Sequence, residues 1–457
     1  MMRFRYIAVL AIIFVGVNTN AQEERRELRL TLNECVEVAL TSSAQIEQFK
    51  YTVAIAETQV DNARNSFFPT TSNMSWSISR GVQGPREGQV LDQTTGTLVQ
   101  LLGEDRITGG QNFRIGGLTM PIYDGQIISQ LSSAKNSLMQ TQMQQSGTRQ
   151  TIIFQTKQRY FLLLQAIKLL EVQQERVRVS EESLRRAETL YEIGSAAILQ
   201  VTNARSNLAG LRATLIQREN AVSIAQSNLA FTMGLGTDVD IIPSEEEFEL
   251  LTPKYSFTDA LSIALKEHPD ILGSKYSMLS DRDNYNATRK SLYHPRITMN
   301  MNAYSWSIGK DEDFGGIEDL FLKNYGYGIG LSVTMPLFNF NTSINLKRQK
   351  LLYLRSQEQL DQAKRQKALD LRLRYLNLER FRRLIEANEV AVQAAEENFK
   401  LEEERYNFGG GTFLERLTAQ RDLFDARNNL VQSKYNYLIE MANLENEVGT
   451  PVVGNPE

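Results

Sequence analysis

The chain is poor in the residues that carry most enzymatic and metal chemistry. Its 457 residues include one cysteine, two histidines and two tryptophans. A single cysteine excludes a disulfide within the chain, and Cys35 lies in an apolar-periodic segment where we expect a small buried side chain. His268 and His294 each precede a proline and have no cysteine or second histidine at ligand spacing, which favours turns over a metal site. With no metal site, no cofactor and no nucleophile–base pair, the sequence predicts that the protein is not an enzyme.

Long hydrophobic runs are also missing, except at the N-terminus. Residues 1–21 have the form of a secretory signal peptide, because Arg3 and Arg5 precede about a dozen apolar residues and the small Ala21. The alternative, an N-terminal membrane anchor, is disfavoured because a spanning helix needs about 20 apolar residues. No later segment approaches that length, so we expect a mature chain from Gln22 onwards without a transmembrane helix.

A surplus of positive charge is absent as well. Lys and Arg together number 50 and Asp and Glu together 54, which gives a net charge of −4. Loss of Arg3 and Arg5 with the signal leaves 48 basic residues and a net charge of −6. This balance argues against nucleic acid as a partner, because nucleic-acid-binding surfaces are basic.

What the sequence does contain is a long internal duplication. Landmarks recur at a constant offset, the one that separates Thr119 from Thr334, and segments upstream of them recur at drifting offsets. The constant pairs are Thr119-Met120-Pro121 with Thr334-Met335-Pro336, Tyr191 and Gly194 with Tyr406 and Gly409, and Ala204 with Ala419; the drifting pairs are Phe68-Pro69 with His294-Pro295 and Ser75-Trp76 with Ser305-Trp306. We therefore expect two copies of one supersecondary unit, residues 22–252 and 253–457.

Each copy begins with a segment of helical periodicity. The predicted arm helices are 31–65 and 257–292. Thr31 and Thr258 lie near their starts, where a hydroxyl can accept from free backbone amides. Pro69 and Pro295 follow their ends, because proline lacks the amide and disfavours a helix before it.

Two segments in each copy then alternate with a period of two. In Tyr325–Met335, apolar residues occupy one face and Gly, Ser and Thr the other, as in a transmembrane β-strand. A soluble, half-buried sheet alternates in the same way, but the flanking helices offer it no core partner. The predicted strands are 71–80, 111–120, 297–308 and 325–335, with external connectors 81–110 and 309–324 and a bulge between Ala303 and Tyr304. Because four strands do not close a barrel and open edges are forbidden in lipid, we expect an obligate oligomer.

A long helical run follows each second strand and turns back at a glycine-rich tip. The predicted outgoing helices are 122–193 and 337–408, and the return helices are 196–233 and 412–448. One apolar seam repeats every seven residues and faces another, which predicts antiparallel coiled coils; the seams are Val201, Leu208, Leu215, Val222 and Leu229, and Leu163, Ile167, Leu170, Val177 and Leu184. Since an outgoing helix of about 70 residues is roughly 105 Å long and each return helix is about half of that, the arm helix is expected to stack end to end on the return helix.

In this order and spacing the chain resembles the TolC-type outer membrane efflux family over residues 30–451. The motifs that carry the resemblance are Pro121-Ile122-Tyr123-Asp124-Gly125 with Pro336-Leu337-Phe338-Asn339, and Tyr191 to Ala204-Arg205 with Tyr406 to Ala419-Gln420. The resemblance implies a mainly α-helical homotrimer with a 12-stranded membrane β-barrel, four strands per subunit, continuous with a coiled-coil tunnel. It places the barrel in outer membrane lipid and the helices in the periplasm. It also implies a periplasmic adaptor and an inner-membrane RND or ABC transporter as partners.

Members of this family hold the tunnel aperture shut with a tyrosine, an arginine and rings of aspartate near the hairpin tips. By resemblance, Tyr406 matches the tyrosine and Glu415 the first acid, whereas Thr418 replaces the second acid and Gly411 the arginine. The predicted constriction is thus Glu415, Thr418, Gln200, Asn203 and Tyr406, with the charged lock only partly present. The alternatives are that Glu415 is an ordinary solvated helix residue and Tyr406 a packing residue.

The tips themselves are small and glycine-rich, so another helix tip can approach them closely. We therefore expect adaptor docking at Gly194, Ser195, Gly409, Gly410 and Gly411. The leading function is the passive outer membrane channel of a tripartite efflux system; the alternative is the outer membrane conduit of a type I protein or peptide secretion system. The substrate does not follow from these residues, because in such systems the pump selects it.

Overall fold

The computed structural model describes residues 26–71, 74–83, 87–91, 94, 98–102, 106–236, 239–244, 250, 252–310, 325–336 and 339–450. The predicted signal peptide, 1–21, lies outside them. The chain forms two compact units. The hairpin unit comprises Met1–Ile46, Thr148–Ala260 and Asp370–Glu457, and the strand unit comprises Glu47–Gly147 and Leu261–Leu369. Each unit draws on both predicted copies, so a copy is not a separate globular domain.

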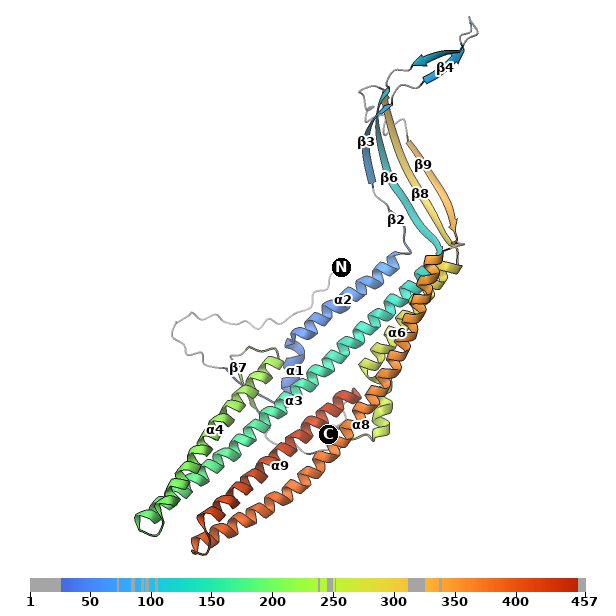
Figure 1. Ribbon diagram of the computed structural model, residues 1–457. Helices are drawn as coiled ribbons and strands as arrows, with labels where there is room; N and C mark the ends of the chain where they lie inside the picture. The colour runs from blue at the N-terminus through green and yellow to red at the C-terminus, as the bar shows by residue number, and fades with distance from the viewer. Residues whose placement is uncertain are drawn as a thin grey trace, which may run out of the picture. The chain divides into compact units, whose positions relative to one another are not determined.

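The order of elements repeats along the chain, which confirms the duplication (Figure 1). An arm of two helices, strands, one long helix and one return helix occur twice. The boundaries 22–252 and 253–457 stay a prediction. Within the described part of the chain, every helix is either too short or too polar to cross a membrane.

The strand unit contains an antiparallel sheet whose main strands match the prediction. These are β2 (Thr70–Thr71), β3 (Met74–Gln83), β6 (Arg106–Asp124), β8 (Arg296–Lys310) and β9 (Tyr325–Thr334). β6 pairs with β2 and β3 on one side and with β8 on the other, and β8 pairs with β9. The connector 81–110 is not a plain loop as expected, because β4 (Glu87–Leu91) and β5 (Leu98–Leu102) form a separate hairpin within it. Most of the connector 309–324 lies outside the described residues.

The predicted bulge between Ala303 and Tyr304 is wrong. The register from β8 to β9 is continuous there, and the two register shifts lie between β6 and β8. β6 carries the extra residue at both, between Ile115 and Leu118 and between Pro121 and Tyr123. Tyr304 needs no bulge because its ring covers Gly326, where a Cβ would lie only 2.6 Å from it. The sequence pattern showed that the apolar phase changes, but only the partner strand showed which chain absorbs the extra residue.

The two predicted helical hairpins are confirmed (Figure 1). They are α3 (Gly125–Glu192) with α4 (Ile198–Thr232), and α8 (Phe340–Asn407) with α9 (Phe413–Val448). α3 and α8 each have 68 residues, and α4 and α9 have 35 and 36. The return helices are thus half as long as the outgoing ones, as the sequence predicted. Val177 faces Leu208 and Leu211 in one buried cluster, which confirms the opposing heptad seams.

The arms are broken where single helices were predicted. They are α1 (Leu32–Ser42) with α2 (Ala44–Asn65), and α5 (Phe257–Glu267) with α6 (Pro269–Tyr293). His268 is extended because Pro269 disfavours a helical residue before it, and its ring accepts from the Asp270 amide as the N-cap of α6. Thr31 caps α1 as expected, whereas α5 is capped by Ser256 rather than Thr258. His294 ends α6, so both histidines lie at helix boundaries.

The core of the hairpin unit gathers around the junction of α1 with α4. Cys35 and Ala39 are buried against Leu229 and Met233 of α4, which confirms Cys35 as a small buried side chain. The end of α1 meets the end of α4, where Gly234 leaves no room for a Cβ beside the Ser42 carbonyl. The first arm therefore stacks on its return helix as expected. A short parallel pair, β1 (Arg26–Leu30) with β7 (Val239–Pro243), was not predicted.

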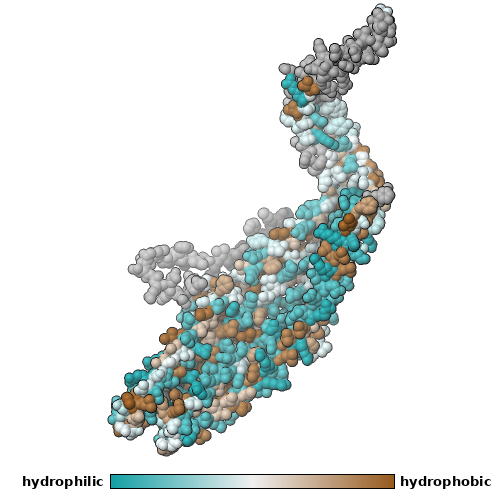
Figure 2. All heavy atoms as spheres, in the orientation of Figure 1, coloured by the Kyte–Doolittle hydropathy of each residue, from teal (hydrophilic) through white to brown (hydrophobic). Residues whose placement is uncertain are grey.

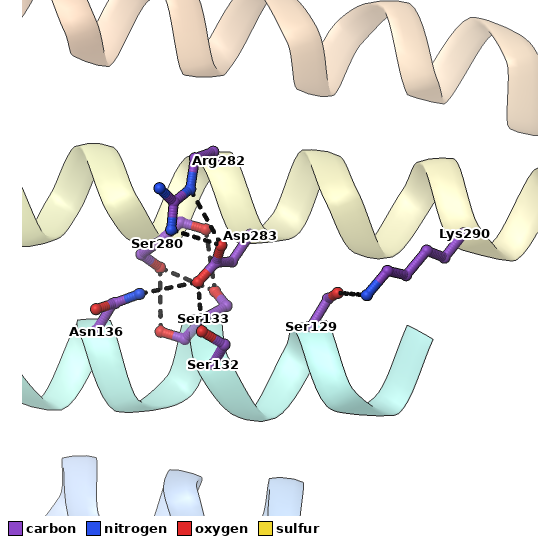
Figure 3. Close-up of polar contacts among 8 residues, drawn as sticks. All are labelled: Ser129, Ser132, Ser133, Asn136, Ser280, Arg282, Asp283 and Lys290. Atoms are coloured by element: carbon purple, nitrogen blue, oxygen red, sulfur yellow. Dashed lines mark hydrogen bonds and ion pairs between the residues drawn. The ribbon is translucent and has the colours of Figure 1, made fainter. Parts of the chain in front are cut away.

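In the strand unit, the first turns of α3 pack on α6 through a polar seam rather than through leucines (Figure 3). The buried Asp283 accepts from Ser132 at 2.6 Å and from Asn136 at 2.9 Å. Ser133 and Ser280 exchange a hydroxyl hydrogen bond at 2.9 Å. Because the polar groups of this seam are hydrogen-bonded to one another, they fix the register of the two helices without the cost of burying an unpaired group.

Candidate functional site at the hairpin ends

The two hairpin tips have the same backbone. At the first tip, the Ser195 amide donates to the Leu190 carbonyl at 2.8 Å, and at the second the Gly410 amide donates to the Arg405 carbonyl at 2.9 Å. Gly194 and Gly409 hold φ near +75°, a left-handed conformation that favours glycine. The correspondence between the two copies is therefore preserved down to individual hydrogen bonds.

Gly411, for which the resemblance implies an arginine in relatives, lies where the structure leaves little room for a side chain. A Cβ at this position would lie 3.1 Å from the Tyr406 nitrogen and 3.3 Å from Arg405 atoms. The chain thus turns closely against the last turn of α8. Gly410, by contrast, has space around it, since the nearest atom to a Cβ there is 3.8 Å away.

Glu415 has a local role that the sequence did not suggest. Thr412 and Glu415 form a capping box, with the Thr412 amide donating to the Glu415 carboxylate at 2.8 Å and the Glu415 amide donating to the Thr412 hydroxyl at 3.2 Å. These hydrogen bonds, and to a lesser degree the nearby Arg405, lower the pKa of Glu415. The first tip has no such cap, because Ala197 occupies the N-cap of α4. Glu415 is exposed and ionised at neutral pH.

Polar contacts join the two hairpins just above their tips. The Tyr406 hydroxyl of α8 donates to the Gln200 side chain of α4 at 3.4 Å. Arg186 of α3 donates to Asn407 of α8 at 2.9 Å and lies 3.6 Å from Glu403. The structure thus brings together Tyr406 and Gln200, two of the predicted constriction residues. Their contact runs between the two copies of the repeat.

The largest fully buried side chain among the described residues lies in the same place, and it is an arginine. Arg416 of α9 is 2% exposed. Its guanidinium lies 5.3 Å from the centre of the Tyr406 ring and 5.8 Å from that of Phe413. Its ion pair with Glu403 is 3.5 Å long, and its Nε has no hydrogen-bond partner among the described residues. Burial lowers the pKa of Arg416, and the charge of Glu403 opposes this.

Arg416, Glu403 and Arg186 are the residues that the sequence reasoning missed. A signal for Arg416 was present, because its counterpart in the first copy is Val201, a member of the predicted apolar seam. A charged residue at a seam position predicts a buried polar group. The predicted Asn203 and Thr418 are both exposed, and Thr418 lies one turn after Glu415 on α9.

Large apolar side chains surround the tips. Ile193, Ile198 and Leu199 are exposed at the first tip, and Phe408 and Leu414 at the second. Figure 2 shows hydrophobic surface at the free ends of the hairpins. Exposed apolar groups gathered in this way are typical of a surface that another protein covers.

The match to a family model decides what this fold is. The model of the outer membrane efflux protein family matches residues 35–235 and 260–450. The chain belongs to the outer membrane efflux protein family. It is 23% identical to outer membrane protein TolC of Vibrio cholerae over 394 residues, 86% of this chain and 84% of TolC. It is 23% identical over 331 residues to a probable efflux pump outer membrane protein of Pseudomonas putida, TtgC, covering 71% of this chain and 66% of TtgC.

A solved structure shows the same fold. A membrane protein from Pseudomonas aeruginosa superposes with a TM-score of 0.78 at 16% identity, covering 98% of this chain and 99% of that one. This outer membrane efflux protein is therefore a TolC-like channel of the outer membrane, with its helical part in the periplasm. Its relatives are channel proteins rather than enzymes. Among the described residues, no cluster of His, Cys, Asp and Glu side chains is arranged to hold a metal ion.

Proposed function

We propose that this protein is the passive, trimeric outer membrane channel of a tripartite efflux system. It receives solutes from a periplasmic adaptor and an inner-membrane transporter of the RND or ABC type and conducts them to the exterior. The observation that carries the proposal is the open sheet. In the described sheet, β3 pairs only with β6 and β9 only with β8, so both edges are free to pair with another chain.

The faces of the sheet support its completion in lipid. Tyr325, Tyr327, Ile329, Leu331 and Val333 of β9 are all exposed. The opposite face of β9 carries glycine, which leaves room for Tyr304 and Asn302 of β8. An apolar outer face with a polar inner face is the pattern of a barrel around a water-filled lumen. β2 and β3 follow one another along the same side of β6 and count as one strand, so three copies of four strands give the 12 strands that the family resemblance implies.

The helices support assembly with further copies as well. α8 leaves a row of large apolar side chains exposed along its length; these include Ile344, Leu351, Leu354, Leu369 and Leu376. The spacing of Ile344 to Leu351, and of Leu369 to Leu376, is one heptad, as in a coiled-coil seam. A neighbouring copy would bury this row, which a lone monomer would expose to water.

The hairpin ends fit two further roles, docking of the adaptor and closure of the tunnel aperture. The exposed apolar tips, with Gly194, Ser195, Gly409, Gly410 and Gly411, form the surface for the adaptor. Glu415, Thr418, Gln200, Asn203 and Tyr406 line the aperture above it, and the contact of Tyr406 with Gln200 helps to close it. No cofactor takes part, because conduction is passive.

Two measurements test this proposal. In native mass spectrometry, the detergent-extracted protein should have about three times the mass of the 51.9 kDa chain, less the signal peptides. In planar bilayers, the purified protein should conduct ions with neither nucleotide nor adaptor present. A monomer in detergent, or bilayers without current, would contradict the proposal.

A further inference from the structure

A cavity of about 250 Å³ lies between the two hairpins beside the predicted constriction, one of whose residues, Thr418, belongs to its lining. Its apolar wall comes from both sides, with Leu211 of α4 facing Leu414 and Leu417 of α9. Cavities for drug-sized molecules are commonly about 300–1,000 Å³. This one suits a molecule of amino-acid size that contacts α4 and α9 at once.

The cavity is also lined by a buried amide that has no hydrogen-bond partner in the described part of the chain. Gln420 of α9 is 2% exposed, and neither its Nε2 nor its Oε1 has a hydrogen bond among the described residues. Leaving a buried donor and a buried acceptor unpaired is costly, and native proteins pair nearly all such groups. The counterpart of Gln420 in the first copy is the exposed Arg205, which pairs with Glu188, so the repeat itself does not require a buried amide here.

Two guanidinium groups complete the lining. Arg176 of α3 donates to Asp425 through one nitrogen at 3.3 Å, and Arg421 of α9 pairs with the adjacent Asp422 at 3.0 Å. A guanidinium has five N–H donors, so each retains donors for a ligand. Because each arginine already shares an aspartate, the cavity suits a single carboxylate better than a multiply charged phosphate.

We propose that this cavity binds a small monocarboxylate with an apolar body and an adjacent N–H, the chemistry of an N-acylated apolar amino acid. The carboxylate accepts from Arg176 and Arg421 and, through one of its oxygens, from the Gln420 Nε2; the neighbouring N–H donates to the Gln420 Oε1. The apolar body packs on the leucines. A small parting of the hairpins brings the amide to the ligand. Bound there, the ligand ties α4 to α9.

Binding is tested on the purified full-length protein in detergent by calorimetry, with N-acetyl-leucine as the probe. Two related probes each remove one recognised group: 4-methylpentanoate lacks the N–H and acyl oxygen, and N-acetyl-leucinamide lacks the carboxylate. We expect each to bind about tenfold more weakly or worse, the loss expected for one good polar contact. The result does not depend on conduction, so it stands apart from the test of the channel function.

Variants assign the contacts. Gln420→Leu should abolish the preference for N-acetyl-leucine over 4-methylpentanoate. Arg421→Gln should reduce the preference over N-acetyl-leucinamide, because Arg176 still donates to the carboxylate. Arg205→Gln, the matched control at the first-copy counterpart of Gln420, should change neither. Gln420→Met serves as a second variant if Gln420→Leu lowers the helix content. Equal binding of all three probes, unchanged preferences in the variants, or no binding because ordered water or a second copy fills the cavity would each overturn the proposal.

Discussion

Arg416 and Glu403 form an ion pair at the hairpin end, and we predict that replacing one or the other has opposite effects on the stability of that end. Arg416→Leu removes a charge whose Nε is unpaired among the described residues and whose ion partner Glu403 is 3.5 Å away. Relief of one unsatisfied buried donor is worth about 1–3 kcal/mol. The loss of two ring contacts offsets about 1–2 kcal/mol of this. Exchange of a poorly satisfied buried ion for an apolar side chain is commonly neutral or stabilising. We therefore expect a hairpin end that is unchanged or up to about 2 kcal/mol more stable.

Glu403→Gln should act the other way, because it leaves the buried guanidinium of Arg416 without a countercharge. Breaking a fully buried pair costs about 3–5 kcal/mol. The Glu403 side chain is 34% exposed and its distance to Arg416 is long, so we expect about 2 kcal/mol. In the double variant the cost should disappear. Arg186→Gln is the control, since it removes the outer partner of Glu403, an exposed pair worth less than about 1 kcal/mol.

Amide hydrogen exchange of residues 400–424 in the detergent-solubilised protein measures this stability locally, without requiring reversible unfolding of a membrane protein. A loss of about 2 kcal/mol corresponds to exchange about 30-fold faster in Glu403→Gln. Arg416→Leu should exchange at the wild-type rate or more slowly. The reasoning is refuted if Arg416→Leu accelerates exchange more than Glu403→Gln does. The contacts of Arg416 with the Tyr406 and Phe413 rings would then stabilise the hairpin by more than its unpaired donor destabilises it.

Three further predictions follow from the strands, the tips and the constriction. Ile329→Arg should reduce the amount of assembled trimer in the outer membrane, because a charge on the lipid face costs about 2–4 kcal/mol. Gly330→Arg should be tolerated, because a Cβ at this position meets nothing within 4 Å. Equal yields of both trimers in membrane fractions would show that the assigned faces are wrong. Gly410→Trp should abolish export and leave trimers intact, while Gly210→Trp on the open face of α4 should export normally. If both variants export in a drug-susceptibility assay, the adaptor docks at a site other than the tips. Glu415→Gln should lower cation selectivity and weaken divalent block in planar bilayers, since three carboxylates about 8 Å apart repel by roughly 2 kcal/mol per pair at an effective dielectric of about 20. Glutamine is chosen because it keeps the capping box. Unchanged selectivity would show that Glu415 does not line the constriction. Because the pKa of Glu415 is lowered, its contribution to the cap is present at neutral pH and is lost only as the pH falls below the ordinary value of 4.5 through the lowered pKa.

Local periodicity in the sequence was enough to determine the main strands and the two helical hairpins. Alternation over Tyr325–Met335 specified a strand, the seven-residue spacing from Val201 to Leu229 specified a coiled coil, and glycines at 194 and 409 specified the tips. Each of these features depends on residues within one strand, one helix or one turn, so the local sequence is enough to predict it. The constant offset between the copies then determined the architecture, since whatever one copy forms the other forms as well.

Only the tertiary structure decided the features that depend on what packs opposite. The extra residues at the two register shifts of the sheet lie on β6 and not on β8, because the partner strand determines which side of a pair bulges. Arg416 is buried while Glu415 beside it is exposed, because the rings of Tyr406 and Phe413 cover only one face of α9. Glu415 bonds to its own helix cap, and the Gln420 amide meets no partner among the described side chains across the hairpins. Sequence periodicity predicts which face of a helix is buried. Whether a polar group on that face finds a hydrogen-bond partner depends on segments far away in the chain, which no local pattern encodes.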